Sequence, residues 1–227
     1  MKVLVIGDVI IDKYIYGTSE RLSPEAPVPV VKHLHEVETL GGAGLVYENL
    51  KSLGVNVTLM ESDHGYRSVK TRVICDGHYV TRIDNDKRAS GNAVLADVLS
   101  NDFSQYEYVI LSDYDKGVLD NAKEIIAHIN TFGCKVLVDP KRPASYYEGA
   151  WLIKPNMLEE SQYGFGQHHW NWIVTDAKGP VRARINKVMY TVEPEQVEVS
   201  DVTGAGDCFL ATFVYGLTKG YDHTRSL

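Results

Sequence analysis

The most restrictive feature of this 227-residue sequence is a succession of short apolar runs that alternate with segments of helical spacing. The runs are rich in Val, Ile and Leu, as expected for strands buried on both faces of a parallel sheet. Residues 92–99 and 121–132 have the apolar spacing of helices. This alternation predicts an α/β fold with a mainly parallel central sheet. The predicted strands are residues 3–6, 108–111, 135–138, 151–153 and 172–174, and residues 181–199 predict an antiparallel hairpin.

Polar residues stand where these predicted strands end. Ligands of open α/β sheets bind in the crevice at the carboxyl ends of the strands. We therefore expect the polar residues to line a binding crevice. They are Asp8, Ser112-Asp113, Asp139-Pro140-Lys141, Lys154-Pro155-Asn156 and Thr175-Asp176. Asp8 and the nearby Asp12 are candidates for binding hydroxyl groups, with capping of a turn by Asp8 and solvation of Asp12 as the structural alternatives.

Two segments predict a second, smaller sheet. Residues 69–73 and 79–83 alternate with a period of two, and Asp76-Gly77 lies between them as a hairpin turn. The Pro-rich segment 23–31 excludes a central strand but is compatible with an extended edge ribbon. Residues from about 13–40 and 68–85 are thus predicted to form a lid on a single domain that spans residues 1–227.

The sequence Asp201-Val202-Thr203-Gly204-Ala205-Gly206-Asp207 precedes an apolar run of helical spacing. A glycine turn that opens a helix directs backbone N–H groups at one point, and the helix dipole adds positive charge there, so the turn can hold phosphate oxygens. Asp207 in the first helical turn suits a general base that takes a proton from an attacking hydroxyl. Asp is also favoured at helix starts for structural reasons. This stretch alone therefore does not distinguish a catalytic base from a helix cap.

A second glycine pair, Gly41-Gly42, precedes a short helix predicted to end at Gly54. Glycines allow the backbone to approach a ligand closely. Taken in isolation, a simple loop is the plainer interpretation of this pair.

Composition narrows the class of protein. The net charge is −7 with scattered Lys and Arg, which argues against a nucleic-acid surface and, more weakly, against an anionic membrane surface. The cysteines, Cys75, Cys134 and Cys208, are far apart and lack metal-ligand spacing, as expected for reduced thiols. The apolar run at the N-terminus is too short for a signal peptide or a membrane span. We therefore expect a cytoplasmic protein.

Five stretches together resemble the ribokinase-like (PfkB-type) sugar kinases, most closely the heptose 7-phosphate kinase branch. The Gly-Ala-Gly-Asp motif is specific to that superfamily, and the segment Ser23–Val30 points to the heptose branch. The resemblance implies a three-layer α/β/α sandwich with a small β-sheet lid. The stretches are Gly7–Tyr14, Ser23–Val30, Gly41–Ala43, Leu111–Tyr114 with Lys116-Gly117, and Asp201–Asp207.

The resemblance also implies roles for single residues. Asp207 is then the catalytic base, and Gly204, Ala205 and Gly206 form the anion hole for the transferred phosphoryl group. The residues on the nucleotide side are Lys141, Asn156, Glu159, Thr175 and Gly179, of which Asn156 and Glu159 match an Asn-x-x-Glu motif that organises Mg²⁺ and phosphate indirectly. The sugar side comprises Asp8, Asp12, Gly41 and Gly42, with Arg82 and Asp84 reaching in from the lid. Candidates for a cationic contact to a sugar phosphate are Arg21, Lys70 and Arg72.

The function implied is an ATP- and Mg²⁺-dependent kinase, with room for a monovalent cation, that phosphorylates the anomeric hydroxyl of a heptose 7-phosphate. Because members of the family that this sequence resembles are considerably longer, we expect a chain that ends at Leu227 to lack the family's adenine-side segment. Two alternatives therefore stay open: a truncated, non-catalytic relative that binds sugar phosphate or a partner protein, and a kinase for another sugar such as fructose or ribose. Exposed edges of the lid predict a homodimer through it.

Overall fold

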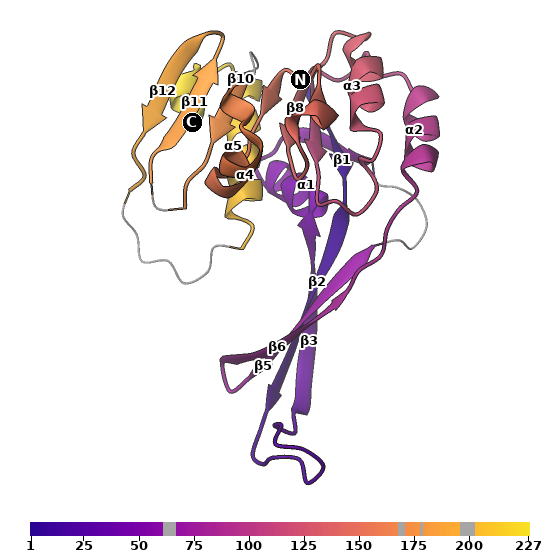
Figure 1. Ribbon diagram of the computed structural model, residues 1–227, viewed down its shortest axis with the longest axis vertical. Helices are drawn as coiled ribbons and strands as arrows, with labels where there is room; N and C mark the ends of the chain where they lie inside the picture. The colour runs from indigo at the N-terminus through magenta and orange to yellow at the C-terminus, as the bar shows by residue number, and fades with distance from the viewer. Residues whose placement is uncertain (61–66, 168–170, 178, 196–202) are drawn as a thin grey trace.

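The computed structural model describes residues 1–60, 67–167, 171–177, 179–195 and 203–227. Within these residues an α/β body carries a long, narrow sheet that projects from one end (Figure 1). The body is built on an eight-stranded sheet in the order β12-β11-β10-β9-β8-β7-β1-β4. Its parallel strands are β1 (Lys2–Gly7), β4 (Asn56–Met60), β7 (Tyr108–Ser112), β8 (Lys135–Asp139), β9 (Leu152–Ile153) and β10 (Asn171–Val174).

All five predicted parallel strands are confirmed, whereas β4 was not predicted. The antiparallel hairpin is also confirmed as β11 (Val181–Ile185) and β12 (Val188–Val192), which pair with each other and with β10. The remainder of the segment predicted for this hairpin includes residues 196–199, which lie outside the described residues.

Both faces of the central sheet are buried, as the apolar runs predicted. Along β1, Val3 and Val5 pack into one hydrophobic cluster and Leu4 and Ile6 into another. The first cluster lies under α1 (Ala43–Ser52) and α5 (Ala205–Thr218), which contact each other. The second lies under α2 (Gly91–Leu99) and α3 (Ala122–Asn130). Helices therefore cover both faces, which confirms the three-layer sandwich (Figure 1).

Shorter helices complete the body. The helix α4 (Met157–Tyr163) follows β9, and α6 (His223–Ser226) contacts α5. The 3₁₀ turns η1 (Ala144–Tyr147) and η2 (Phe165–Gln167) each bury an aromatic side chain, Tyr147 and Phe165. Among the described residues no helix is long and apolar enough to cross a membrane.

The second sheet, here called the small sheet, has the order β3-β2-β5-β6. Its strands are β2 (Val9–Thr18), β3 (Lys32–Gly42), β5 (Ser68–Cys75) and β6 (His78–Asn85). β2 and β5 run parallel, while β3 and β6 form antiparallel edges. The turn between β5 and β6 falls at Asp76-Gly77 as predicted, with φ angles of 50° and 78°. Positive φ at both central residues is what a two-residue hairpin turn of type I′ requires.

Two expectations about the small sheet were wrong. The Pro-rich segment is not an extended ribbon but part of the connection between β2 and β3, at the far tip of the small sheet (Figure 1), where Val28 N donates to Ala26 O across a tight turn. Proline has no N–H for a ladder, so the strand starts only at Lys32. Gly41-Gly42 is not a simple loop either, because β3 ends at Gly42 and α1 begins at Ala43.

Candidate active site

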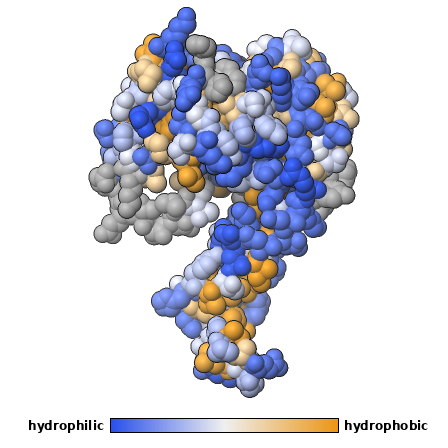
Figure 2. Space-filling model, in the orientation of Figure 1, coloured by the Kyte–Doolittle hydropathy of each residue, from blue (hydrophilic) through white to orange (hydrophobic). Residues whose placement is uncertain are grey.

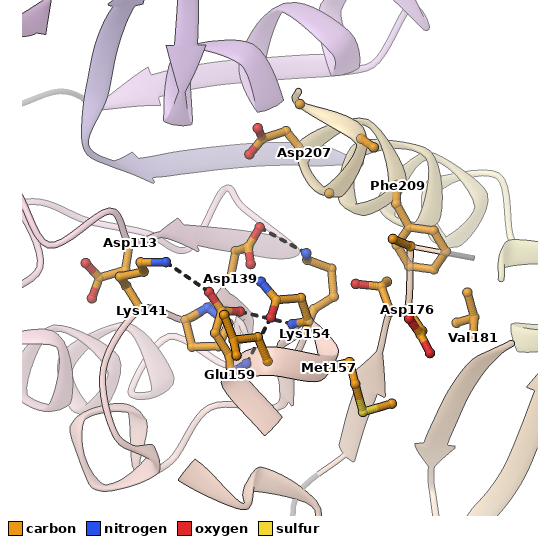
Figure 3. A pocket seen from close by; sticks show the side chains of 18 of the residues that line it. Asp113, Asp139, Lys141, Lys154, Met157, Glu159, Asp176, Val181, Asp207 and Phe209 are labelled. Carbon is orange, nitrogen blue, oxygen red and sulfur yellow. Dashed lines mark hydrogen bonds and ion pairs between the residues drawn. The ribbon is translucent and has the colours of Figure 1, made fainter. Parts of the chain in front are cut away.

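A pocket of about 630 Å³ opens between the carboxyl ends of the central strands and the start of α5 (Figure 3). Its lining includes most of the residues that were predicted to line the crevice. Those that line it are Asp113, Asp139, Pro140, Lys141, Lys154, Asn156, Thr175 and Asp176, whereas Asp8, Ser112 and Pro155 do not line the pocket. The residues Gly204 to Asp207 complete the lining from the start of α5.

The start of α5 is shaped by Gly204. Its φ of 76° lies in the left-handed region, and a Cβ there would collide with the side chain of Leu45. The helix begins at Ala205, and the first N–H groups of a helix have no partner within it. This end of α5 can therefore hold an anion. Asp201 and Val202 of the same motif lie outside the described residues.

Asp207 lies in the first turn of α5 and is only 4% exposed. The hydroxyl of Tyr114 lies 2.9 and 3.0 Å from its two carboxylate oxygens. Burial, followed by the negative charge of Asp139, raises the pKa of Asp207 to about 7, against the lowering effects of the Tyr114 hydroxyl and the Lys154 ammonium. A carboxylate with a pKa near neutral pH is well matched to general base catalysis.

A buried ion pair lies across the pocket from Asp207 (Figure 3). The Nζ atom of Lys154, which is 2% exposed, lies 3.1 Å from Oδ2 of Asp139. Burial raises the pKa of Asp139, and Lys154 opposes this. A Cβ on Gly206 would lie 3.2 Å from Nζ of Lys154, so the absence of a side chain at Gly206 brings this ammonium close to the start of α5. An ammonium and a helix N-terminus together favour an anion such as phosphate.

Sequence reasoning assigned Lys154 only to the crevice and gave it no role in binding phosphate. The signal for such a role was its position between a buried strand and Pro155-Asn156. That signal was weak, because lysines at strand ends are usually solvated.

Asn156 and Glu159 form a capping box at the start of α4. Glu159 N donates to Oδ1 of Asn156 at 2.9 Å, and Asn156 N donates to Oε2 of Glu159 at 3.0 Å. The Nζ atom of Lys141 lies 3.3 Å from Oε1 of Glu159. The predicted nucleotide-side residues Lys141, Asn156 and Glu159 thus form one cluster on the pocket wall. Figure 3 shows Lys141 and Glu159 in this cluster.

Thr175 and Gly179 were also predicted on the nucleotide side. Thr175 lines the pocket, and its carbonyl oxygen accepts the N–H of Met157 at 2.9 Å, which joins the end of β10 to the start of α4. Gly179 lies beside the carboxylate of Asp176 and is not part of the lining. The adjacent Lys178 lies outside the described residues.

The predicted sugar-side residues lie where the small sheet joins the body. Asp8 is 1% exposed, and its carboxylate accepts the backbone N–H groups of Tyr114, Lys116 and Val118 at 2.8–3.1 Å. Asp8 therefore shapes the loop after β7, and its contact with a sugar stays a prediction. Asp12 forms an ion pair with Arg72, and a side chain at Gly41 would collide with the Asp12 carboxylate.

The remaining lid candidates are farther along the small sheet. Arg82 and Asp84 on the edge strand β6 pair with each other at 2.7 and 2.8 Å, and neither lines the pocket. Lys70 lies opposite Asp12 in the sheet register, and Arg72 lies opposite Tyr14. Arg21 belongs to the connection between β2 and β3, at the tip of the small sheet farthest from the body (Figure 1).

A buried network that the sequence did not indicate supports the loop after β7. The guanidinium of Arg142 donates to both oxygens of Asp113 at 3.0 and 3.1 Å and to Asp120 at 3.0 Å. The hydroxyl of Tyr147 donates to Asp113 at 2.7 Å. Arg142, Asp113 and Tyr147 are all buried. Fully paired buried charges of this kind fix the conformation of the segments that they join.

With this geometry in place, comparison with known proteins decides the family. The model of the pfkB family of carbohydrate kinases matches residues 43–227. The chain belongs to the pfkB family of carbohydrate kinases. This confirms the resemblance drawn from the five sequence stretches.

Curated members of the pfkB family extend the comparison. The chain is 33% identical to the bifunctional protein HldE of Nitratiruptor over 96% of its own length and 57% of that protein. It is 32% identical to the D-beta-D-heptose 7-phosphate kinase of Bordetella bronchiseptica, with 93% of the chain and 82% of that kinase covered. The chain thus spans little more than half the length of the bifunctional relatives that it matches.

Solved structures show the same fold. The tetrameric inhibited form of phosphofructokinase-2 from Escherichia coli superposes with a TM-score of 0.75 at 15% identity, over 99% of this chain and 90% of that one. A nucleoside kinase from Burkholderia thailandensis in complex with inosine gives a TM-score of 0.69 at 16% identity, over 100% and 86% of the two chains. The ribokinase-like fold of pfkB kinases is therefore confirmed for this chain.

Proposed function

We propose that the chain is an ATP-dependent sugar kinase that phosphorylates the anomeric hydroxyl of a heptose 7-phosphate. One observation carries the proposal: a buried carboxylate with a pKa of about 7, that of Asp207, lies in the first turn of a helix whose start forms an anion site. The relatives named as HldE and as D-beta-D-heptose 7-phosphate kinase support the choice of sugar.

The pocket supplies what phosphoryl transfer requires from a protein, which is positioning, charge stabilisation and a base. In the proposed reaction the anomeric hydroxyl gives its proton to Asp207 as its oxygen bonds to the γ-phosphorus of ATP, and the bond from that phosphorus to ADP breaks. The N–H groups at the start of α5 and the ammonium of Lys154 would stabilise the charge of the transferred group. Lys141, Asn156 and Thr175 line the side of the pocket that we assign to the nucleotide.

Magnesium fits this site in an indirect role. The side chains of Asn156 and Glu159 are hard oxygen donors, but each is engaged by the backbone of the other and Glu159 also by Lys141. Among the residues that the structure describes, no cluster of three or more His, Cys, Asp or Glu residues could hold a metal ion. Mg²⁺ bound to ATP keeps several waters and would meet Asn156 and Glu159 through them. Its role when bound is to neutralise phosphate charge.

The phosphate already present on the sugar needs a cationic contact. Lys70 and Arg72 lie on the same face of the small sheet as Asp12, because directly paired residues point to the same side. Ile10 of this face lies beside Gly42, so the face continues toward the body. We therefore propose that Lys70 and Arg72, rather than Arg21 at the distant tip, contact the sugar phosphate.

We also propose that two copies of the chain pair through their small sheets. Both edge strands carry strongly exposed apolar side chains, because Leu34 is 58% exposed on β3 and Ile83 is 57% exposed on β6. Figure 2 shows hydrophobic residues gathered on the projecting small sheet. Exposed apolar edge strands are normally paired or covered, and a second copy presents a matching edge. We expect the wild type to sediment as a dimer.

Ile83→Asp is expected to sediment as a monomer, because it places a charge in the proposed interface. Leu99→Asp is the matched control, since Leu99 is an apolar side chain that is 52% exposed on α2 of the body, away from the small sheet, and its replacement removes apolar surface and adds the same charge. Analytical ultracentrifugation with circular dichroism as a check of folding decides the matter. A monomeric wild type, or an Ile83→Asp dimer as tight as the wild type, would contradict the proposal.

The proposed activity is tested by ADP release in the presence of ATP and Mg²⁺. The acceptors to compare are D-glycero-D-manno-heptose 7-phosphate, fructose, fructose 6-phosphate and ribose. Turnover with the heptose phosphate alone is the expected result. Turnover with another sugar would support the kinase function but contradict the proposed heptose substrate. Absence of turnover from folded protein that still binds a sugar phosphate would favour the non-catalytic alternative.

A further inference from the structure

Tyr114 occupies a position in the pocket to which none of the predicted roles assigns a function. Its side chain comes from the loop after β7 and lines the pocket beside Asp207. The phenolic oxygen lies 2.9 Å from one oxygen of the Asp207 carboxylate and 3.0 Å from the other. A hydroxyl has a single proton to donate, so it can satisfy one of these oxygens at a time.

The position of Tyr114 is fixed from three directions. Its backbone N–H donates to the Asp8 carboxylate at 2.8 Å, and the same oxygen accepts the N–H of Lys116. The preceding Asp113 is held by Arg142 and Tyr147. On the ring itself, a Cβ at Gly42 would lie only 3.4 Å from Cδ2, so the glycine leaves room for the ring to lie against the base of the small sheet.

These contacts show that residues treated separately in the sequence analysis all help to position Tyr114. Asp8 and Gly42 were predicted to hold sugar hydroxyls, yet in the structure both lie against Tyr114 or its backbone. The ends of β1, β3 and β7 therefore converge on Tyr114, and its phenol contacts the candidate base.

We propose that Tyr114 is a positioning residue for Asp207, one that holds the carboxylate through its hydroxyl and leaves one carboxylate oxygen directed at the acceptor hydroxyl of the bound sugar. The proposal rests on the kinase function proposed above. Removal of the Tyr114 hydroxyl removes this hydrogen bond and, with it, a constraint on the orientation of the carboxylate. The orientation of a base within hydrogen-bond reach of its proton is a condition for efficient transfer.

The charges around Asp207 determine how removal of the Tyr114 hydroxyl changes the pKa of Asp207. Asp139 from β8 and Asp12 from β2 disfavour the ionised carboxylate, while Lys154 after β9 and the Tyr114 hydroxyl favour it. Removal of the hydroxyl therefore raises the pKa of Asp207 further above its already raised value. Burial and the nearby Asp207 raise the pKa of Tyr114 itself, so its hydroxyl stays protonated throughout the range in which Asp207 titrates.

Tyr114→Phe is the test, because it removes one oxygen atom and keeps the ring. We expect the acid limb of the kcat profile to move upward by about one pH unit. At pH 6 kcat should fall about tenfold below the wild type, and at pH 9 it should recover to within about twofold, since the base is then ionised in both proteins. Tyr108→Phe is the matched control, because Tyr108 is a buried tyrosine at the opposite end of β7. Its acid limb should not move.

A second readout is independent of turnover. The ¹³C chemical shift of the Asp207 carboxyl, assigned by its loss in Asp207→Asn, reports its titration directly, and Tyr114→Phe should raise the midpoint by the same amount. An unmoved midpoint and acid limb in folded Tyr114→Phe would overturn the proposal, as would a higher KM for the sugar with no movement of the limb. If the wild type turns over no sugar, the proposed kinase function fails, while the carboxyl titration still decides whether Tyr114 controls Asp207.

Discussion

Replacement of Asp207 by Asn is expected to lower kcat by about 10²–10⁴-fold, the usual contribution of a general base. Asn has nearly the same shape and can still accept the Tyr114 hydroxyl, but it cannot take a proton from the sugar. Binding of the sugar phosphate and of ATP should stay close to that of the wild type. Steady-state ADP release measures the first effect, and isothermal titration calorimetry measures the second.

Asp97→Asn provides the matched control, because Asp97 is exposed on α2 and does not line the pocket. Its kcat should equal that of the wild type. An Asp207→Asn variant that retains more than about a tenth of wild-type kcat would show that another group takes the proton.

Replacement of Lys154 by Met has the second large expected effect. It leaves the Asp139 carboxylate in a setting that is only 15% exposed without the ammonium that it contacts. Removal of one member of a buried ion pair costs about 3–5 kcal/mol, so the free energy of unfolding should fall by about that amount at pH 8. The loss should be smaller at pH 5.5, because burial already raises the pKa of Asp139 and protonation removes the unpaired charge. Urea unfolding at the two pH values measures the difference.

The double variant Asp139→Asn/Lys154→Met separates stability from catalysis. It removes both charges, so it should recover most of the stability lost in Lys154→Met. It should nevertheless remain impaired in turnover, because the ammonium next to Gly206 is still missing. A Lys154→Met variant as stable as the wild type at pH 8 would contradict the stabilising role of the ion pair. A double variant with full activity would contradict the role of the Lys154 ammonium in turnover.

The central sheet and the crevice could be predicted because both depend on local patterns. A buried β-branched run indicates a strand, and the rule that ligands bind at the carboxyl ends of strands then assigns Asp139, Lys141 and Asn156 to one pocket. Most of the residues assigned in this way line the pocket, although the order of the strands in the sheet was not predicted.

The contacts that set the orientation and the pKa of Asp207 could not be predicted from local patterns. Tyr114 and Asp207 are 93 positions apart, and no local pattern relates them. Asp8 was correctly assigned to the end of a strand, but only the fold reveals that three backbone N–H groups engage its carboxylate. The pKa of Asp207 likewise depends on burial and on Asp139, both of which arise from the tertiary structure.

The Pro-rich segment shows the limit of reasoning from a single rule. Proline is compatible with an edge strand, but compatibility does not exclude a turn. In the structure a turn at Ala26–Val28 and the bridge between Leu22 and Pro29 close the segment on itself.

The most direct test of the proposed chemistry is ³¹P NMR of the wild type with ATP, Mg²⁺ and D-glycero-D-manno-heptose 7-phosphate. The proposed function predicts that the signals of ATP are replaced by those of ADP and that the γ-phosphoryl group appears as a second phosphomonoester, on the anomeric carbon. The same mixture with Asp207→Asn should stay unchanged over the same time. An unchanged heptose phosphate in the presence of wild-type protein, or release of the γ-phosphate only as inorganic phosphate, would contradict the proposal that the chain is a heptose 7-phosphate kinase with Asp207 as its base.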